Sequence, residues 1–183
     1  MKKAVVLFVL SILFFSCAKS KLPSGNISPE NLDGIFYIKW DDDIFTVNDI
    51  LKENNFQILL HDPDNEFIII NGGNGNVISL KFYEDKFFEA SVYTSYYNNT
   101  KNEYEKQYGM FVNMLTEKYG IPYLASDTSN VWKFMNNSTI HISYFIDISG
   151  VMHFVLIFRD DTIYKRKYMG IYDNLYQFYF TGV

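Results

Sequence analysis

The chain has 183 residues and an acidic balance, with 16 basic and 21 acidic side chains and a net charge of −5. This charge repels nucleic acid and anionic lipid headgroups, so we exclude both as primary partners. Aromatic residues make up 19% of the chain, a content too high for intrinsic disorder, and the length suits one folded domain.

The N-terminal stretch has the composition of a secretory signal. Two lysines precede an apolar run from Ala4 to Phe15. The run has about a dozen residues, fewer than the roughly 20 that a transmembrane helix needs. A small residue, Ser16, separates it from Cys17, the only cysteine in the chain. We therefore expect residues 1–16 to be removed as a signal peptide.

The end of this stretch, LFFSC at residues 13–17, resembles the lipobox of bacterial lipoproteins, although Phe14 stands where that family most often has leucine. The resemblance implies that Cys17 is acylated on its sulfur and becomes the mature N-terminus. It also implies a protein held by lipid in the bacterial cell envelope. Ala18 in the next position is consistent with the outer membrane in a cell with two membranes. An ordinary secretory leader or an uncleaved anchor is the alternative.

Residues 18–28 (AKSKLPSGNIS) are polar and interrupted by Pro23 and Gly25. As a flexible coil they span about 18 Å r.m.s., at 5–6 Å times the square root of the length. We expect residues 17–28 to tether a single domain at 29–183. Once Cys17 is acylated, no thiol remains for a disulfide, a thiolate metal site or a cysteine nucleophile.

The first half of the domain, residues 34–97, predicts a strand, a short helix and three further strands. Residues 34–40 (GIFYIKW) favour a strand, and Thr46 with Asp49 forms an acidic variant of a capping box that opens a helix over 47–54. Apolar runs and alternating apolar and polar residues then predict three strands. They cover residues 66–71, 76–83 and 87–95, with turns at 72–75 and 84–86.

The second half, residues 98–160, repeats this order. Thr100 and Glu103 form a capping box, and apolar residues follow a helical period until Gly120, which predicts a helix over 101–119. Strands are predicted over 131–135, 139–146 and 151–158, with turns at 136–137 and 149–150.

The two halves keep a nearly constant register. Leu51 and Leu115 are 64 positions apart, and Val77 and Ile140 are 63 apart. A true duplication and a chance register both fit this spacing. We predict an α+β fold in which one antiparallel sheet, built from two αβββ units, packs against helices.

The tandem order of elements resembles the fold of the β-lactamase-inhibitor protein and of the small lipoprotein of the outer-membrane assembly machine. Residues 34–122, which close on KYGIP at 118–122, are also similar to a class of small, uncharacterised secreted bacterial proteins. The resemblance implies a role in binding proteins, by analogy of fold.

The C-terminal segment, residues 161–183, is rich in aromatic side chains around a basic run (KRK) at 165–167. One interpretation is an amphipathic helix or strand that closes the core. The other is an exposed aromatic patch that seats a partner, because tyrosine anchors cost little side-chain entropy. In that case the candidate partner-binding residues are Tyr172, Tyr176, Phe178 and Tyr179.

No pattern of residues predicts a reaction or a metal site. The histidines His61, His141 and His153 lack metal-binding spacing, and alternation places His141 on the solvated face of its strand. The acidic run HDPDNE at 61–66 lacks the glycine and the distal glutamate of an EF-hand loop. No GxSxG motif is present. We therefore predict no catalytic residue, metal ligand or cofactor.

These observations favour a non-enzymatic, membrane-anchored envelope lipoprotein that binds another envelope protein as a subunit, assembly factor or inhibitor. The alternative is a module for a small ligand or a glycan, with Trp40 and Trp132 as stacking candidates, although isolated tryptophans more often belong to the core. An enzyme with a dispersed motif is a third class. A deep polar pocket would favour the last two classes, and a broad exposed aromatic patch would favour a protein partner.

Overall fold

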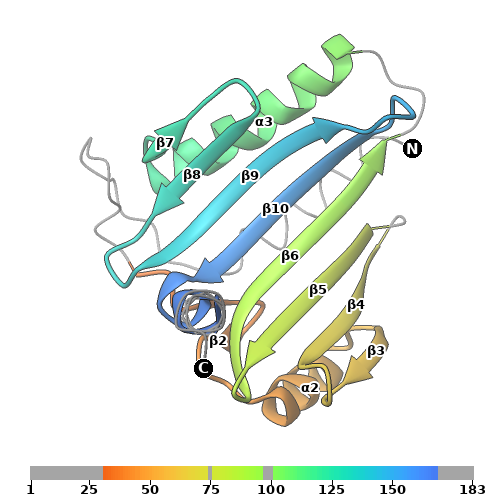
Figure 1. Cartoon of the computed structure of the whole chain (residues 1–183), viewed down its shortest axis with the longest axis vertical. Coiled ribbons are helices and arrows are strands. Elements are labelled where there is room, and N and C mark those ends of the chain that lie inside the picture. Colours follow the sequence, from red (N-terminus) through yellow and green to blue (C-terminus); the bar gives the residue numbers. More distant parts are fainter. Residues whose placement is uncertain (1–30, 74–75, 97–100, 169–183) are drawn as a thin grey trace, which may run out of the picture.

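The computed structural model describes residues 31–73, 76–96 and 101–168, and these form the α+β fold that the sequence predicts (Figure 1). An eight-stranded antiparallel sheet forms the body, and a separate two-stranded hairpin precedes it. The described elements are β1 (Gly34–Ile35), β2 (Ile38–Lys39), α2 (Ile44–Glu53), β3 (Ile58–Asp62), β4 (Phe67–Gly73), β5 (Asn76–Tyr83), β6 (Lys86–Tyr96), α3 (Lys101–Tyr119), β7 (Leu124–Ala125), β8 (Ser129–Lys133), β9 (Ser138–Ile146), β10 (Met152–Asp160) and a helix at 161–168.

The sheet consists of two halves with the same internal order. Its strand order is β3-β4-β5-β6-β10-β9-β8-β7, so the last strands of the halves, β6 and β10, pair at the centre. Each half is a helix followed by four strands, one more than the sequence predicts. The additional strands, β3 and β7, lie at the two edges. A bulge between Ile58 and Leu60 breaks the alternation in β3, and β7 has only two residues.

A constant offset relates the two halves. Ile78 pairs with Val92 between β5 and β6, and their counterparts 64 positions later, Ile142 and Leu156, pair between β9 and β10. The same offset relates the buried leucines of α2 and α3. The register predicted from the sequence is therefore a property of the fold, which has an internal pseudo-two-fold arrangement about the β6–β10 seam.

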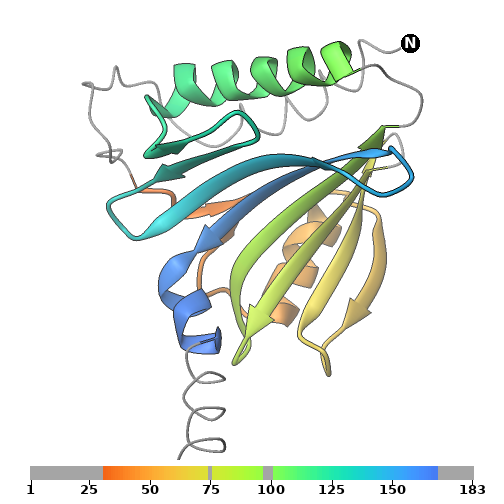
Figure 2. The same ribbon diagram turned by 45° about the horizontal axis from the view of Figure 1, so that its top comes forward.

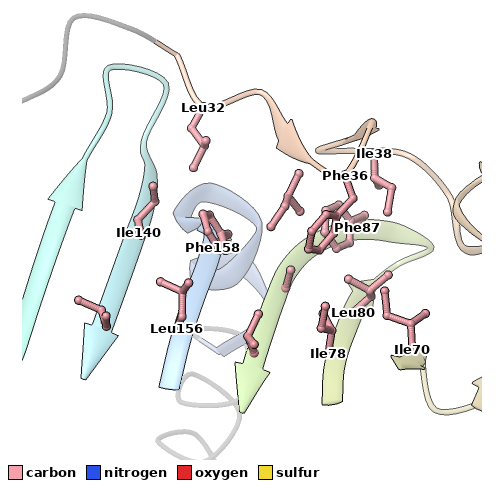
Figure 3. Close-up of a cluster of buried hydrophobic side chains, with 14 of the residues drawn as sticks. Leu32, Phe36, Ile38, Ile70, Ile78, Leu80, Phe87, Ile140, Leu156 and Phe158 are labelled. Carbon is pink, nitrogen blue, oxygen red and sulfur yellow. The ribbon is translucent and has the colours of Figure 1, made fainter. Parts of the chain in front are cut away.

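Both α2 and α3 cover the same face of the sheet (Figure 2). Tyr108 of α3 packs on Tyr144 and Phe154, with ring centroids 5.0 and 6.3 Å away. Apolar side chains of several strands point to this side, beneath Leu32, Phe36 and Ile38 of the N-terminal segment (Figure 3). The strand residues labelled in that view are Ile70, Ile78, Leu80, Phe87, Ile140, Leu156 and Phe158. The core is thus continuous across both halves, and losing one buried leucine side chain typically costs about 2–5 kcal/mol.

The prediction of a single strand over residues 34–40 is wrong. The chain turns back at Phe36 and Tyr37, whose φ angles are 55° and 67°, and forms the β1–β2 hairpin. Two successive left-handed residues match the tight turns that join short antiparallel strands. The turn brings Trp40 inward to stack on Phe87, with ring centroids 5.0 Å apart. This tertiary contact selects a hairpin where the local pattern favours a strand.

The helix predicted over 47–54 begins earlier in the structure. Asp43 is the N-cap of α2, and its carboxylate accepts hydrogen bonds from the backbone N–H groups of Phe45 and Thr46, each at 2.9 Å. Thr46 donates its hydroxyl hydrogen to the same carboxylate at 2.6 Å, so it does not cap the helix itself. In contrast, the helix predicted over 101–119 is confirmed at both ends.

Within the ranges that the structure describes, no helix has both the length and the apolar composition needed to cross a bilayer. The predicted signal peptide, Cys17 and the tether lie outside these ranges.

Candidate protein-binding face

We name the sheet face opposite α2 and α3 the open face. Strand register defines its side chains, because residues paired across neighbouring strands point to the same side. One row crosses all eight strands, and the next row crosses the strands from β4 to β8. The first row is Leu60, Ile69, Ser79, Ser91, Ile157, His141, Val131 and Leu124, and the second is Asn71, Val77, Tyr93, Val155, Ser143 and Ser129.

The centre of the open face combines exposed apolar side chains with small hydroxyls. Tyr93 is 49% exposed and Val77 beside it is 38% exposed, whereas Ser91 is buried. The solvated face of an antiparallel sheet is normally polar, so exposed apolar residues at its centre are informative. A half-exposed tyrosine offers both apolar area and a hydroxyl, which is typical of an interface anchor.

A part-buried ion pair borders this centre. Lys81 Nζ donates to Glu89 Oε1 at 2.7 Å, and Ser91 Oγ donates to the same oxygen at 2.8 Å. Burial acts to lower the pKa of the Lys81 ammonium, but the hydrogen bond and the charge of Glu89 outweigh burial and raise that pKa above its ordinary value. The open face therefore presents a neutralised pair at this position.

The helix at 161–168 covers one end of the open face. Tyr164 lies over the guanidinium of Arg159, with 3.8 Å between Cζ and the ring centroid. Lys167 Nζ donates to the carbonyl oxygen of Phe82 at 2.9 Å and lies 3.4 Å from a carboxylate oxygen of Glu66. These contacts join the helix to β10 and to the β5–β6 end of the first half.

His141 lies on the open face, as alternation predicts, but its side chain is half-buried rather than solvated, and its Nε2 is 2.8 Å from Ser129 Oγ. Burial, followed by the nearby charge of Arg159, lowers the pKa of His141 below its ordinary value, so the ring is neutral at pH 7. Among the described residues, no three metal-ligating side chains gather in one place. The acidic run at 61–66 forms a turn in which Asp62 accepts a hydrogen bond from the backbone of Asn65 at 3.1 Å.

A chain of Ser, His and Asp side chains lies near the β9–β10 turn. Ser95 Oγ is 2.9 Å from His153 Nδ1, and His153 Nε2 is 2.8 Å from Asp147 Oδ2. In a serine-protease triad the ring is the other way round, with Nε2 toward the serine and Nδ1 toward the aspartate. No local sequence pattern indicates this arrangement, because Ser95 and His153 are 58 positions apart.

Asp147 also holds the turn itself. Its carboxylate accepts hydrogen bonds from the backbone N–H groups of Ser149 at 2.8 Å and Val151 at 3.0 Å. The hydrogen bond with His153 is the main reason why the pKa of Asp147 lies well below its ordinary value. We interpret the Ser95–His153–Asp147 chain as a clamp that joins β6 to the β9–β10 hairpin.

The remaining residues singled out from the sequence fall into two groups. Trp40 and Trp132 are 9% and 1% exposed, and the indole N–H of Trp132 donates to the carbonyl oxygen of Gly120 at 2.8 Å. Neither tryptophan is free to stack on a sugar. The four candidate partner-binding aromatics of the C-terminal segment, residues 172, 176, 178 and 179, lie outside the described residues.

No family model, curated protein or solved structure matches the chain.

Proposed function

We propose that the protein is a non-enzymatic lipoprotein of the bacterial cell envelope that is anchored through acylated Cys17 and binds another envelope protein on its open face. The signal-like leader and the lipobox-like residues 13–17 support the anchor. The observation that carries the binding function is the open face, where Tyr93 and Val77 are exposed and the described helices α2 and α3 lie on the other side.

The chemistry of the open face defines the partner surface. Tyr93 and Val77 require an apolar counterpart on the partner, and the Tyr93 hydroxyl and the half-buried Ser79 require hydrogen-bonding groups beside it. Lys81 and Glu89 neutralise each other. We therefore expect affinity for the partner to depend weakly on salt, because few unpaired charges on this face attract it.

A cross-linking pull-down from cells tests the partner-binding face. We expect Tyr93→Ala to reduce capture of one specific envelope protein by about 30-fold, the effect of losing roughly 2 kcal/mol at a hot spot. Tyr37→Ala is the matched control, because Tyr37 is 62% exposed but lies in the β1–β2 turn. Equal capture by both variants, at equal abundance, would exclude the open face as the binding surface.

Metabolic labelling with a fatty acid tests the anchor separately. The wild-type protein should incorporate label, and Cys17→Ser should not, because only the Cys17 sulfur is available for acylation. Equal incorporation in the two proteins would rule out acylation at this position.

A further inference from the structure

The two edges of the sheet differ in length. β7 has two residues and comes shortly after Pro122, whereas β3 has five residues. An edge strand has a row of backbone N–H and C=O groups that point outward. Among the described residues, no strand pairs with the outer side of β3, which lies beyond β4 in Figures 1 and 2. The sheet can therefore accept one more strand at β3.

The side chains of β3 leave this edge open to another chain. Natural edges are protected by lysine, by proline or by a bulge. β3 has a bulge at its start but contains no lysine or proline, and Leu59 and Leu60 are 50% and 45% exposed. From Leu60 to Asp62 the strand pairs regularly with β4. The edge thus combines backbone hydrogen-bonding groups with apolar area, the two features that strand addition uses.

Strand register determines which side chains an added strand would meet. Leu60 and Asp62 point to the open face, whereas His61 points to the side of α2. There His61 contacts Phe45, with ring centroids 6.1 Å apart, and Phe45 is 60% exposed. Side chains of an added strand alternate between the same two sides. Such a strand therefore needs an apolar residue beside Leu60.

Two carboxylates determine the charge at the end of this edge. Asp64 is exposed in the turn after β3, and Asp62 accepts hydrogen bonds from the backbone and the side chain of Asn65 at 3.1 and 2.9 Å. The side-chain bond, followed by the backbone bond, lowers the pKa of Asp62 below its ordinary value, so this carboxylate is ionised at pH 7. Within the described residues, no lysine or arginine forms an ion pair with Asp62 or Asp64. A basic side chain on an added strand would supply the opposite charge.

We propose that β3 binds an extended segment of a partner protein by strand addition, with an apolar residue beside Leu60 and a basic residue two positions away, beside Asp62. Backbone hydrogen bonds supply the affinity, and the two side chains supply the specificity. A second copy of β3 contains no lysine or arginine, so it does not offer this charge. The site lies three strands from Tyr93, about 14 Å across the sheet, and is distinct from the centre of the open face.

Fluorescence polarisation with a labelled peptide of sequence TVTKTV tests this site on the full-length protein in a non-ionic detergent. Its valines and its lysine share one face of a strand. We expect saturable binding, weakened about tenfold or more by Leu60→Lys, because an edge lysine opposes strand pairing. Leu124→Lys is the matched control, since Leu124 is 60% exposed at the other edge. Absence of saturable binding, or equal affinity for wild type and Leu60→Lys, would overturn the proposal.

Modified peptides separate strand addition from attraction between charges. Alternate backbone N–H groups of an added strand point toward β3, and the others point to solvent. Methylation of the first set should weaken binding about tenfold or more, and methylation of the second set should change it by less than about twofold. Exchange of the peptide lysine for glutamate should also weaken binding. Equal affinity for the two methylated peptides would contradict strand addition.

Two further measurements distinguish this site from other interfaces. Tyr93→Ala should bind the peptide with wild-type affinity, whether or not the open face binds an envelope protein. A loss of peptide binding in Tyr93→Ala would place the peptide on the open face and overturn the proposal. Size-exclusion chromatography with light scattering tests a second copy as the occupant. A wild-type dimer that Leu60→Lys dissociates would assign the edge to self-association and would also overturn it.

Discussion

The backbone at Gly34 leaves no room for a side chain. Its φ is +154°, and a Cβ atom would lie 1.8 Å from the carbonyl oxygen of Ile38 in the facing strand β2. We expect Gly34→Ala to lower the free energy of unfolding by about 1–3 kcal/mol, the usual cost of a strained backbone position. Urea denaturation monitored by circular dichroism measures this change.

Gly109 provides the control for this substitution. It lies within α3, and apart from the neighbouring residues and backbone of the helix itself no atom lies within 4 Å of the position that its Cβ would take. Gly109→Ala should raise the free energy of unfolding by about 0.5–1 kcal/mol, because alanine favours helix over the unfolded chain. A loss of stability of the same size in both variants would contradict the distinction between the two sites.

His141 makes stability depend on pH. Its pKa in the folded protein lies below the ordinary value of 6.5 because of burial, so the unfolded chain binds the proton more readily. The stabilisation is fully present above about pH 6.5 and decreases as pH falls toward the lower, folded-state pKa. We expect His141→Gln to lose less stability than the wild type when the pH is lowered from about 7.5 to about 5. Parallel stability curves, measured by urea denaturation across this range, would contradict this role.

At the scale of single elements, α2 shows which residue begins a helix. Asp43 accepts two backbone hydrogen bonds at the N-terminus of α2, whereas Asp49 lies within the helix, 4.0 Å from Lys52. Asp43→Ala should therefore cost about 1 kcal/mol of unfolding free energy, and Asp49→Ala should change it by less than about 0.5 kcal/mol. Thermal and urea unfolding distinguish these values. A larger loss of unfolding free energy for Asp49→Ala than for Asp43→Ala would contradict this assignment and support the capping box predicted from Thr46 and Asp49.

Elements with a long, regular pattern could be predicted from the sequence, and the short ones could not. α3 and β5 have the predicted bounds, because their apolar periods are uninterrupted over 19 and eight residues. The β1–β2 hairpin and β3 depend on positive φ angles, a bulge and contacts with distant strands. The composition of the open face could not be predicted for the same reason, because it depends on which strands are neighbours in the sheet. Alternation placed His141 correctly, but no local pattern shows that β6 and β10 are neighbours.

At the scale of the whole molecule, the continuous core predicts that the two halves unfold together. Trp40 lies in the first half and Trp132 in the second, and both are buried. In Trp40→Phe and Trp132→Phe, the remaining tryptophan reports on one half. We expect its fluorescence midpoint in urea to coincide with the circular dichroism midpoint of the same variant. Separate midpoints would show that the halves unfold independently.

The β6–β10 seam also has a consequence for newly made chains. Glu89 of β6 pairs with Arg159 of β10, 70 positions later, so the long strand β6 has an unpaired edge until the second half of the chain folds. The β10 strand of a neighbouring chain offers the same backbone groups in the same register. A domain-swapped dimer, in which each first half is completed by the second half of its neighbour, reproduces the pairing of the monomer seam. We therefore expect a higher concentration of folding chains to favour such a swapped dimer over the monomer.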